Sequence, residues 1–204
     1  DNTGGTVLNQ SGNMILSAQD VTNNEGVIQA GGNLTATLGS YSSNAHSFFT
    51  AEQALAVTVS GNLDNEGTLG GSTDVLVTAD SLTNAASGLL LATGGSLSLN
   101  VGDRQRQAAN DSVLYDSVFG DTVTGTVSNT GTLYSAGGMS LTSTGAFSND
   151  NGTIRAGTDL RVSSTALNNT YGKLLAGHDL GINNSITSAP LSILDNHNGL
   201  MQAG

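Results

Sequence analysis

One short block of residues recurs along almost the whole chain, and its spacing constrains the fold more than any other feature. The block holds an apolar residue, any residue, Asn, a short gap and Gly, as in Leu63-Asp64-Asn65 before Gly67. An internal repeat has to be recognised first, because it changes the interpretation of every local pattern. Further copies begin at Val21-Thr22-Asn23, Leu82-Thr83-Asn84, Val127-Ser128-Asn129, Phe147-Ser148-Asn149, Leu167-Asn168-Asn169 and Leu194-Asp195-Asn196.

The glycines that close these blocks give the length of the repeat. They are Gly5, Gly26, Gly67, Gly88, Gly131, Gly152, Gly172 and Gly199, with spacings of 21, 41, 21, 43, 21, 20 and 27 residues. We interpret the spacings of 41 and 43 as two units of about 21 residues each. The hidden copy in the first begins at Ser47, and a weaker copy in the second begins at Ser112 with Val113-Leu114-Tyr115. The spacing of 27 is one unit with a small insertion, so about ten coils are predicted.

Each unit alternates apolar and polar residues in the way that short β-strands do. After Gly152, the side chains of Ile154 and Ala156 face one side, and a turn at Gly157-Thr158-Asp159 precedes the next apolar positions. Three short strands and three corners account for one unit. A single unit has too few apolar side chains to bury them alone, so stacked units are needed. The chain is therefore predicted to be all-β and to wind as a parallel β-helix.

Polar residues at two corners have structural roles in this fold. The Asn of each block is expected to stack its amide on the amide of the next coil, as in other cross-β ladders. Asp74, Asp159 and Asp179 occupy a turn position that Asn33 also holds. We expect these side chains to accept hydrogen bonds from backbone amides. A ladder of carboxylates that binds cations is the alternative.

The composition excludes several classes of partner. The net charge is −11, and only five residues are basic. Such a chain has no electrostatic footprint for nucleic acid and no basic face for anionic lipid. It also contains no apolar run of about 18 residues, so no membrane span is predicted. Cysteine is absent, which excludes disulfides and thiolate metal sites.

Three stretches interrupt the pattern and are predicted to project as loops, near residues 39–45, 102–110 and 183–192. The first two lie three coils apart and should project from the same side. Loops on a rigid scaffold are where binding residues are usually found. The candidate partner-binding residues in or beside these loops are Tyr41, His46, Phe48, Arg104 and Arg106.

No catalytic, cofactor-binding or metal-binding residue is predicted. His46, His178 and His197 do not lie at a metal-ligand spacing. His178 takes a turn position and is expected to be solvated. The acidic residues are scattered, whereas polysaccharide-cleaving β-helices need clustered acid and base groups.

The stretch Asn149 to Val162 resembles the repeats of filamentous-haemagglutinin-like exoproteins, as do Asn23 to Ala36 and the copy at Gly172. The resemblance implies a right-handed parallel β-helix in a protein secreted by a two-partner system of Gram-negative bacteria. Such proteins include adhesins and the toxin-bearing sticks of contact-dependent growth inhibition. The family's secretion domain carries Asn-Pro-Asn motifs, and none occurs in this sequence. We therefore expect residues 1–204 to be a single β-helix segment from the interior of a longer shaft.

The predicted function is that of a structural shaft segment of a secreted surface adhesin or toxin-delivery protein, and not of an enzyme. It would be extracellular, would need an outer-membrane secretion partner, and would contact a receptor or glycan on another cell. A polysaccharide-degrading enzyme is the first alternative. A receptor-binding segment that acts through the loops is the second. Because the terminal coils expose unpaired strand edges, end-to-end self-association is also expected.

Overall fold

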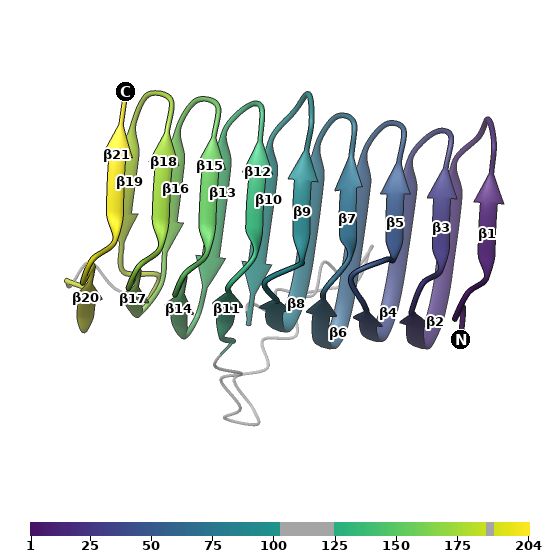
Figure 1. The fold of residues 1–204 in the computed structure, drawn as a ribbon, viewed down its shortest axis with the longest axis horizontal. Coiled ribbons are helices and arrows are strands. Elements are labelled where there is room, and N and C mark those ends of the chain that lie inside the picture. The colour runs from purple at the N-terminus through teal and green to yellow at the C-terminus, as the bar shows by residue number, and fades with distance from the viewer. Residues whose placement is uncertain (103–124, 187–189) are drawn as a thin grey trace, which may run out of the picture.

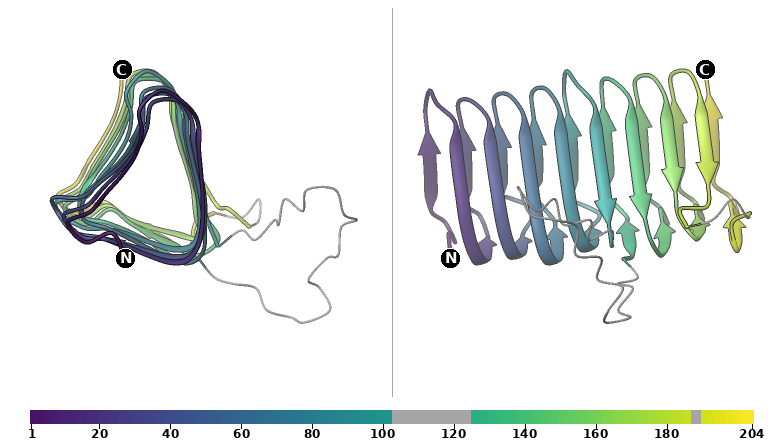
Figure 2. Two further views of the ribbon diagram at one scale, coloured as in Figure 1. Left: turned by 90° about the vertical axis from the view of Figure 1, so that its right-hand side faces the viewer. Right: turned by 180° about the vertical axis from the view of Figure 1, so that it is seen from behind.

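The computed structural model describes residues 1–102, 125–186 and 190–204. Within these ranges the chain forms strands and no helix, and it winds as a parallel β-solenoid with a triangular cross-section (Figure 2). Viewed along the axis from the N-terminus, the chain turns clockwise as it recedes, so the winding is right-handed. The predicted fold class is confirmed. No helix of the described chain is long and apolar enough to cross a membrane.

One side of the triangle is a nine-stranded parallel sheet that contributes one short strand from each coil (Figure 1). Its order along the axis is the order of the chain. The strands are β1 (Thr6–Asn9), β3 (Val27–Ala30), β5 (Phe48–Ala51), β7 (Thr68–Gly71), β9 (Leu89–Ala92), β12 (Thr132–Ser135), β15 (Thr153–Ala156), β18 (Lys173–Ala176) and β21 (Leu200–Ala203).

A twelve-stranded sheet forms the other two sides. In the first four coils a single long strand bends around the corner between these sides: β2 (Met14–Asn23), β4 (Leu34–Ser43), β6 (Leu55–Asn65) and β8 (Val75–Asn84). In later coils the two sides have separate strands, as the sequence predicts. They are β10 (Leu97–Val101), β13 (Met139–Ser143), β16 (Leu160–Ser163) and β19 (Leu180–Asn183) on one side, and β11 (Val127–Asn129), β14 (Ala146–Ser148), β17 (Ala166–Asn168) and β20 (Ile193–Asp195) on the other.

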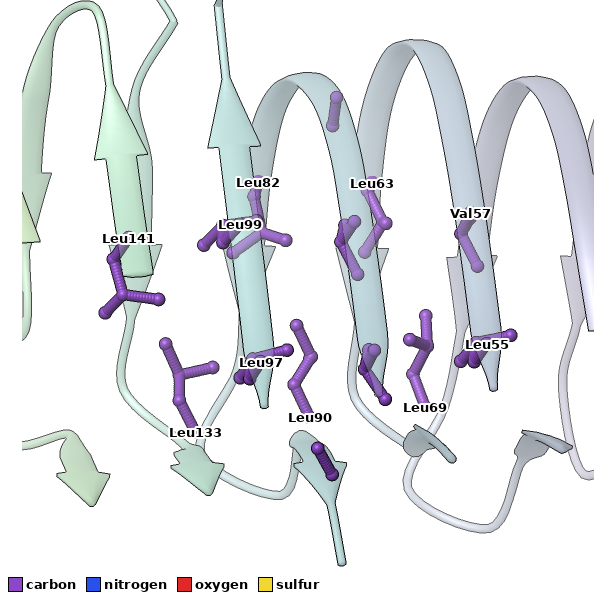
Figure 3. Close-up of a cluster of buried hydrophobic side chains, with 14 of the residues drawn as sticks. Leu55, Val57, Leu63, Leu69, Leu82, Leu90, Leu97, Leu99, Leu133 and Leu141 are labelled. Atoms are coloured by element: carbon purple, nitrogen blue, oxygen red, sulfur yellow. The ribbon is translucent and has the colours of Figure 1, made fainter. Parts of the chain in front are cut away.

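The core is a column of apolar side chains that stack coil on coil inside the triangle (Figure 3). Along the nine-stranded sheet, Leu69 pairs in register with Leu90, which pairs with Leu133. All three side chains are fully buried. Burying such a side chain contributes about 1.5–3 kcal/mol. The core therefore runs without interruption along the axis and belongs to no single coil.

The number of coils differs from the prediction in one place. Strand β5 lies between β3 and β7, which confirms the hidden copy at Ser47. Strand β9, however, pairs directly with β12, so Leu89 is the neighbour of Thr132. The copy predicted at Ser112 is therefore wrong, because no coil separates these two strands. Val113-Leu114-Tyr115 lies outside the described residues. The sheet has nine strands where ten coils were expected.

The predicted loop at 39–45 is also wrong over most of its length. Strand β4 continues through Ser43, and it pairs with β2 and β6 on either side. Its polar residues alternate with inward ones, and Tyr41 points into the core at 1% exposure. The loop at 102–110 lies outside the described residues apart from Gly102. Of the third loop, residues 184–186 and 190–192 are described, and they lie between β19 and β20.

Candidate functional site

A ladder of Asn side chains runs along the inside of one corner. At six steps the amide Nδ2 of one Asn donates to the Oδ1 of the Asn in the next coil, and these bonds all point the same way along the axis; the ladder is interrupted between Asn23 and Asn65. The bonds are Asn2 to Asn23 at 2.7 Å, Asn65 to Asn84 at 2.8 Å, Asn84 to Asn129 at 2.8 Å, Asn129 to Asn149 at 2.6 Å, Asn149 to Asn169 at 2.7 Å and Asn169 to Asn196 at 2.6 Å. The predicted ladder is confirmed.

The ladder explains why glycine ends the repeated block. Nδ2 of Asn149 also donates to the carbonyl of Gly152 at 3.2 Å, which brings the side chain against the glycine. A Cβ on Gly152 would collide with Oδ1 of Asn149 and with the carbonyl of Asn129 in the preceding coil. Asn and Gly are therefore one structural unit: the amide side chain of the Asn occupies space that a side chain at the glycine position would need.

The second polar corner holds the turn residues. Oδ1 of Asn33 accepts the backbone N–H of Ala54 at 3.1 Å, and Oδ1 of Asp74 accepts that of Ser96 at 2.9 Å. Oδ1 of Asp159 accepts the N–H of Asp179 at 3.3 Å. These side chains join successive coils, as the sequence predicts. Within the described part of the chain, no group of three His, Cys, Asp or Glu residues is placed to hold a metal ion.

The outward surface of the nine-stranded sheet differs from the rest of the molecule, and we call it face A. It is formed by the first and third residues of each of its strands. These strands contain no Asp or Glu, although the chain carries a net charge of −11. Arg155 and Lys173, two of the three basic residues in the described ranges, lie on it. Its other larger side chains are Leu8, Val27, Gln29, Phe48, Leu89, Leu91, Tyr134, Leu175, Leu200 and Gln202.

Face A has a shallow hollow beside Gly70, over which the side chain of Leu91 leans. Gly70 holds the third position of β7, between Thr50 of β5 and Leu91 of β9. A hollow of about 160 Å³ surrounds it and is lined by Gln29, Thr50, Glu52, Leu91 and Thr93, among others. Tyr134 lies two strands beyond β7 and Arg155 three strands beyond it. The guanidinium of Arg155 lies over the ring of Tyr134, 6.0 Å from its centroid. A second, wider groove of about 350 Å³ crosses the corner at Gly39 and is lined mainly by Ser and Thr side chains.

Three of the residues that were predicted to bind a partner lie in the described ranges, and these three do not share one surface. Tyr41 is in the core, where its ring packs edge-on against Phe49 with centroids 5.4 Å apart. His46 lies in an exposed turn between β4 and β5. Phe48 points outward on face A at 47% exposure. Arg104 and Arg106 lie outside the described residues.

Burial of Tyr41 has an electrostatic consequence. Burial raises the pKa of the phenol above its ordinary value of 10.0, and the nearby side chains of Ser43 and Asn23 oppose part of that shift. Neither side chain meets hydrogen-bond geometry, so the hydroxyl has no partner among the described residues. Tyr41 is thus a core residue with an unsatisfied polar atom and takes no part in a surface site.

Sequence reasoning missed the residues of face A that now form the most distinctive surface. Leu89, Leu91, Tyr134, Arg155 and Lys173 all follow the glycine of the repeated block by one or three residues. Their outward position follows from strand alternation. The absence of acidic residues at these positions was the available signal.

Comparison with known families assigns the repeat. Residues 1–44, 30–101 and 92–189 match the family model described as the haemagglutinin repeat, and together these matches cover most of the chain. The chain belongs to the haemagglutinin repeat family. Neither a curated protein nor a solved structure matches it significantly. Proteins with haemagglutinin repeats are typically secreted surface adhesins, and the β-solenoid supports a shaft segment of an adhesin-like protein.

Proposed function

We propose that this chain is a structural segment of the shaft of a secreted bacterial surface protein, either an adhesin or a toxin-delivery protein. The observation that carries the proposal is the continuity of the core and of the backbone ladders through all nine strands of the main sheet. Eight spacings of about 4.8 Å give a segment about 38 Å long. Its mechanical role is to hold distal modules away from the cell.

The way in which coils are joined suits a shaft. Each coil bonds to the next through parallel strands on three sides, the Asn ladder at one corner and the Asn or Asp turns at another. Interactions are between neighbours only, so length can be added coil by coil without altering the cross-section.

Duplication of coils tests the shaft. We would insert a second copy of residues 132–172, which span two regular coils, and measure small-angle X-ray scattering. The longest dimension should grow by about 10 Å while the cross-section stays constant. A particle that becomes wider at constant length would contradict the proposal.

The finer parts of the proposal concern export and location. We infer that the full protein leaves the cell through an outer-membrane secretion partner and that this segment lies outside the cell. The absence of cysteine supports export in an unfolded state, since no disulfide can form before passage. Protease shaving of intact cells that express the parent protein should remove the segment. Protection of the segment in intact cells would contradict an extracellular location.

Binding to a receptor or glycan on another cell is a second candidate, and face A favours it. Phe48 is half exposed, and the hollow at Gly70 lies on the neighbouring strand. Fluorescently labelled chain should bind target cells, and replacing Phe48 with Ser should weaken that binding. A polysaccharide-degrading enzyme remains the other alternative, and release of reducing ends from acidic glycans would support it over a shaft.

End-to-end association of the isolated segment is a further proposal. In the last coil, Leu194 has 56% exposure, whereas its stacked neighbour Leu167 is fully buried. The Asn ladder also ends at both termini: Nδ2 of Asn196 has no further Asn to which it donates, and Oδ1 of Asn2 has no preceding Asn from which it accepts. Stacking of one segment on the next would continue both. Sedimentation should show an open series of oligomers as the concentration rises.

A further inference from the structure

We propose that face A binds a second copy of this chain, in an antiparallel arrangement with the two-fold axis lying along β9. The axis lies in the plane of contact and runs in the strand direction. Strands equally far from β9 on its two sides then face each other, and each residue keeps its row. Three complementary pairs share this one centre: one lies within face A, and two join a cation of face A to a carboxylate in a turn beside it.

The first pair is a hollow and an aromatic side chain that would pack in it. Gly70 lies on β7, the strand before β9, and Tyr134 lies on β12, the strand after it. Both occupy the third position of their strand. In the antiparallel dimer, each Tyr134 therefore faces the hollow at Gly70 of the other copy. The hollow of about 160 Å³ lies beside Gly70, and in this arrangement the ring would pack there against the Leu91 side chain that leans over the glycine.

The second and third pairs are opposite charges. Arg155 on β15 faces the β5 strand of the other copy, where exposed Glu52 follows the last residue of the strand. Lys173 on β18 likewise faces β3, where exposed Glu25 lies two residues before the strand. Within one chain these partners lie four and six strands apart, about 19 and 29 Å, so they cannot pair. Among the described residues, Arg161 forms an ion pair with Asp159 at 3.9 Å, on another side of the triangle.

The centre of the contact is apolar. Leu89 and Leu91 lie on β9 and would pack against the same residues of the other copy. Such an isologous contact is closed, so it gives dimers and not fibres. A face of nine strands of four residues offers about 500 Å² per copy, or about 1,000 Å² in total. That area lies at the lower limit for a specific interface, so a weak dimer is expected.

Antiparallel pairing has a consequence for a shaft. Shafts that project from one cell run parallel to each other, whereas shafts that project from two opposed cells run antiparallel. The contact would therefore join cells that carry the same protein. This goes beyond the shaft role, because a shaft needs no lateral partner.

Sedimentation equilibrium of the purified chain, with defined variants, tests the proposal. The R155E/K173E double variant places like charges opposite Glu52 and Glu25 and should weaken dimerisation at least about tenfold. The E52R/R155E variant exchanges the charges of one pair and should restore most of the dimer. R161E is the matched control on another side of the triangle and should leave dimerisation unchanged. Circular dichroism would check that each variant keeps its β-structure.

A second variant separates shape from charge. Tyr134→Ser removes the ring that packs in the hollow and should weaken the dimer several-fold while the effect of salt remains. Raising the salt concentration should weaken the wild-type dimer, since the ion pairs are exposed.

Each other outcome overturns the proposal in a distinct way. A strict monomer at about 500 μM would exclude the dimer. End-to-end stacking can occur beside the dimer, but if R155E/K173E associates to the same extent as the wild type at every concentration, face A binds no second copy. Failure of E52R/R155E to restore a dimer lost in R155E would exclude the antiparallel register. Binding of sulfated dextran by face A without dimerisation would identify an anionic polymer as its occupant. None of these results alters the coil-duplication test of the shaft.

Discussion

Two intervals between block glycines have almost the same length and different structures. The interval from Gly26 to Gly67 contains a complete extra coil with strand β5. The interval from Gly88 to Gly131 contains none, since β9 and β12 are adjacent. The number of residues between two repeats therefore does not decide whether a coil lies between them. Their neighbours in space decide it.

The first interval shows what a coil can lose and still stack. Its block has Ser43 where other coils have the ladder Asn, and Ser47 where they have Gly. The ladder is interrupted there: Nδ2 of Asn23 donates to the carbonyl of Phe48 at 3.1 Å, and Oγ of Ser43 donates to Asn65 at 3.2 Å. The two changes occur together in this coil, and loss of the Asn side chain removes one of the atoms that a Cβ at the glycine position would meet in a regular coil.

The second interval shows how a solenoid accommodates an insertion. The ladder continues across it, with Nδ2 of Asn84 donating to Oδ1 of Asn129 at 2.8 Å. A Cβ built on Gly102 would collide with the backbone of Gly125, so these two glycines are in direct contact. The chain thus leaves the coil and rejoins it at one point. Residues 184–192 separate β19 from β20 at the same corner.

The largest effect is expected at the core of the extra coil. Phe49→Ala should lower the free energy of unfolding by about 3–5 kcal/mol, because Phe49 is fully buried and stacks between Ile28 and Leu69. Chemical denaturation measures the change. Phe48→Ala on the same strand is the control and should cost under about 1 kcal/mol. If both variants lost the same free energy of unfolding, Phe49 would not be a core residue, and the interval from Gly26 to Gly67 would not contain a true coil.

The coupling of Asn and Gly should be measurable in a regular coil. Gly152→Ser should destabilise by about 1–3 kcal/mol, because its Cβ would collide with Asn149. Adding Asn149→Ser reproduces the pair found at positions 43 and 47. The double variant should then lose about 1 kcal/mol less than the sum of the two single changes. Strict additivity in a double-mutant cycle would show that the two replacements in the degenerate coil are unrelated.

The buried phenol beside the interrupted ladder predicts a dependence on alkaline pH. Burial raises the pKa of Tyr41 in the folded chain, so the unfolded chain loses this proton first. The contribution of Tyr41 to the free energy of unfolding should be constant below about pH 10 and should fall as the pH rises from there through the raised pKa. Tyr41→Phe should remove that part of the decline. Parallel unfolding curves of the two proteins above pH 10 would contradict it, with the exposed Tyr171 as the control position.

The smallest effect is expected where the most residues are removed. Deleting 103–124 and joining Gly102 to Gly125 should change the free energy of unfolding by less than about 1 kcal/mol, since loop length affects stability only weakly. The stacking of β9 on β12 would be kept. A large loss of stability would show that the inserted residues support the coils.

Much of the fold followed from the residues alone. The strands, the shared inward side of Ile154 and Ala156, the Asn ladder and the turn role of Asp74 were all predicted correctly. These features repeat, and each depends on the chain within one coil and on an identical neighbour. Among the candidate site residues in the described ranges, only Phe48 lies on face A. Tyr41 lies where strand β4 continues in place of the predicted loop, His46 lies in a short turn, and Arg104 and Arg106 lie outside the described residues.

By itself, the sequence determined the repeat, the alternation along each strand and the stacking of the block Asn, because these patterns recur in each unit. Only the tertiary structure decided which strand stacks on which. It placed Leu91 beside Tyr134, 43 positions away, turned Tyr41 inward, and brought a hollow, two cations and a row of apolar residues onto one face. The physical reason is that the position of a coil along the axis depends on the strands with which it pairs. Two strands can pair whatever number of residues separates them in the sequence.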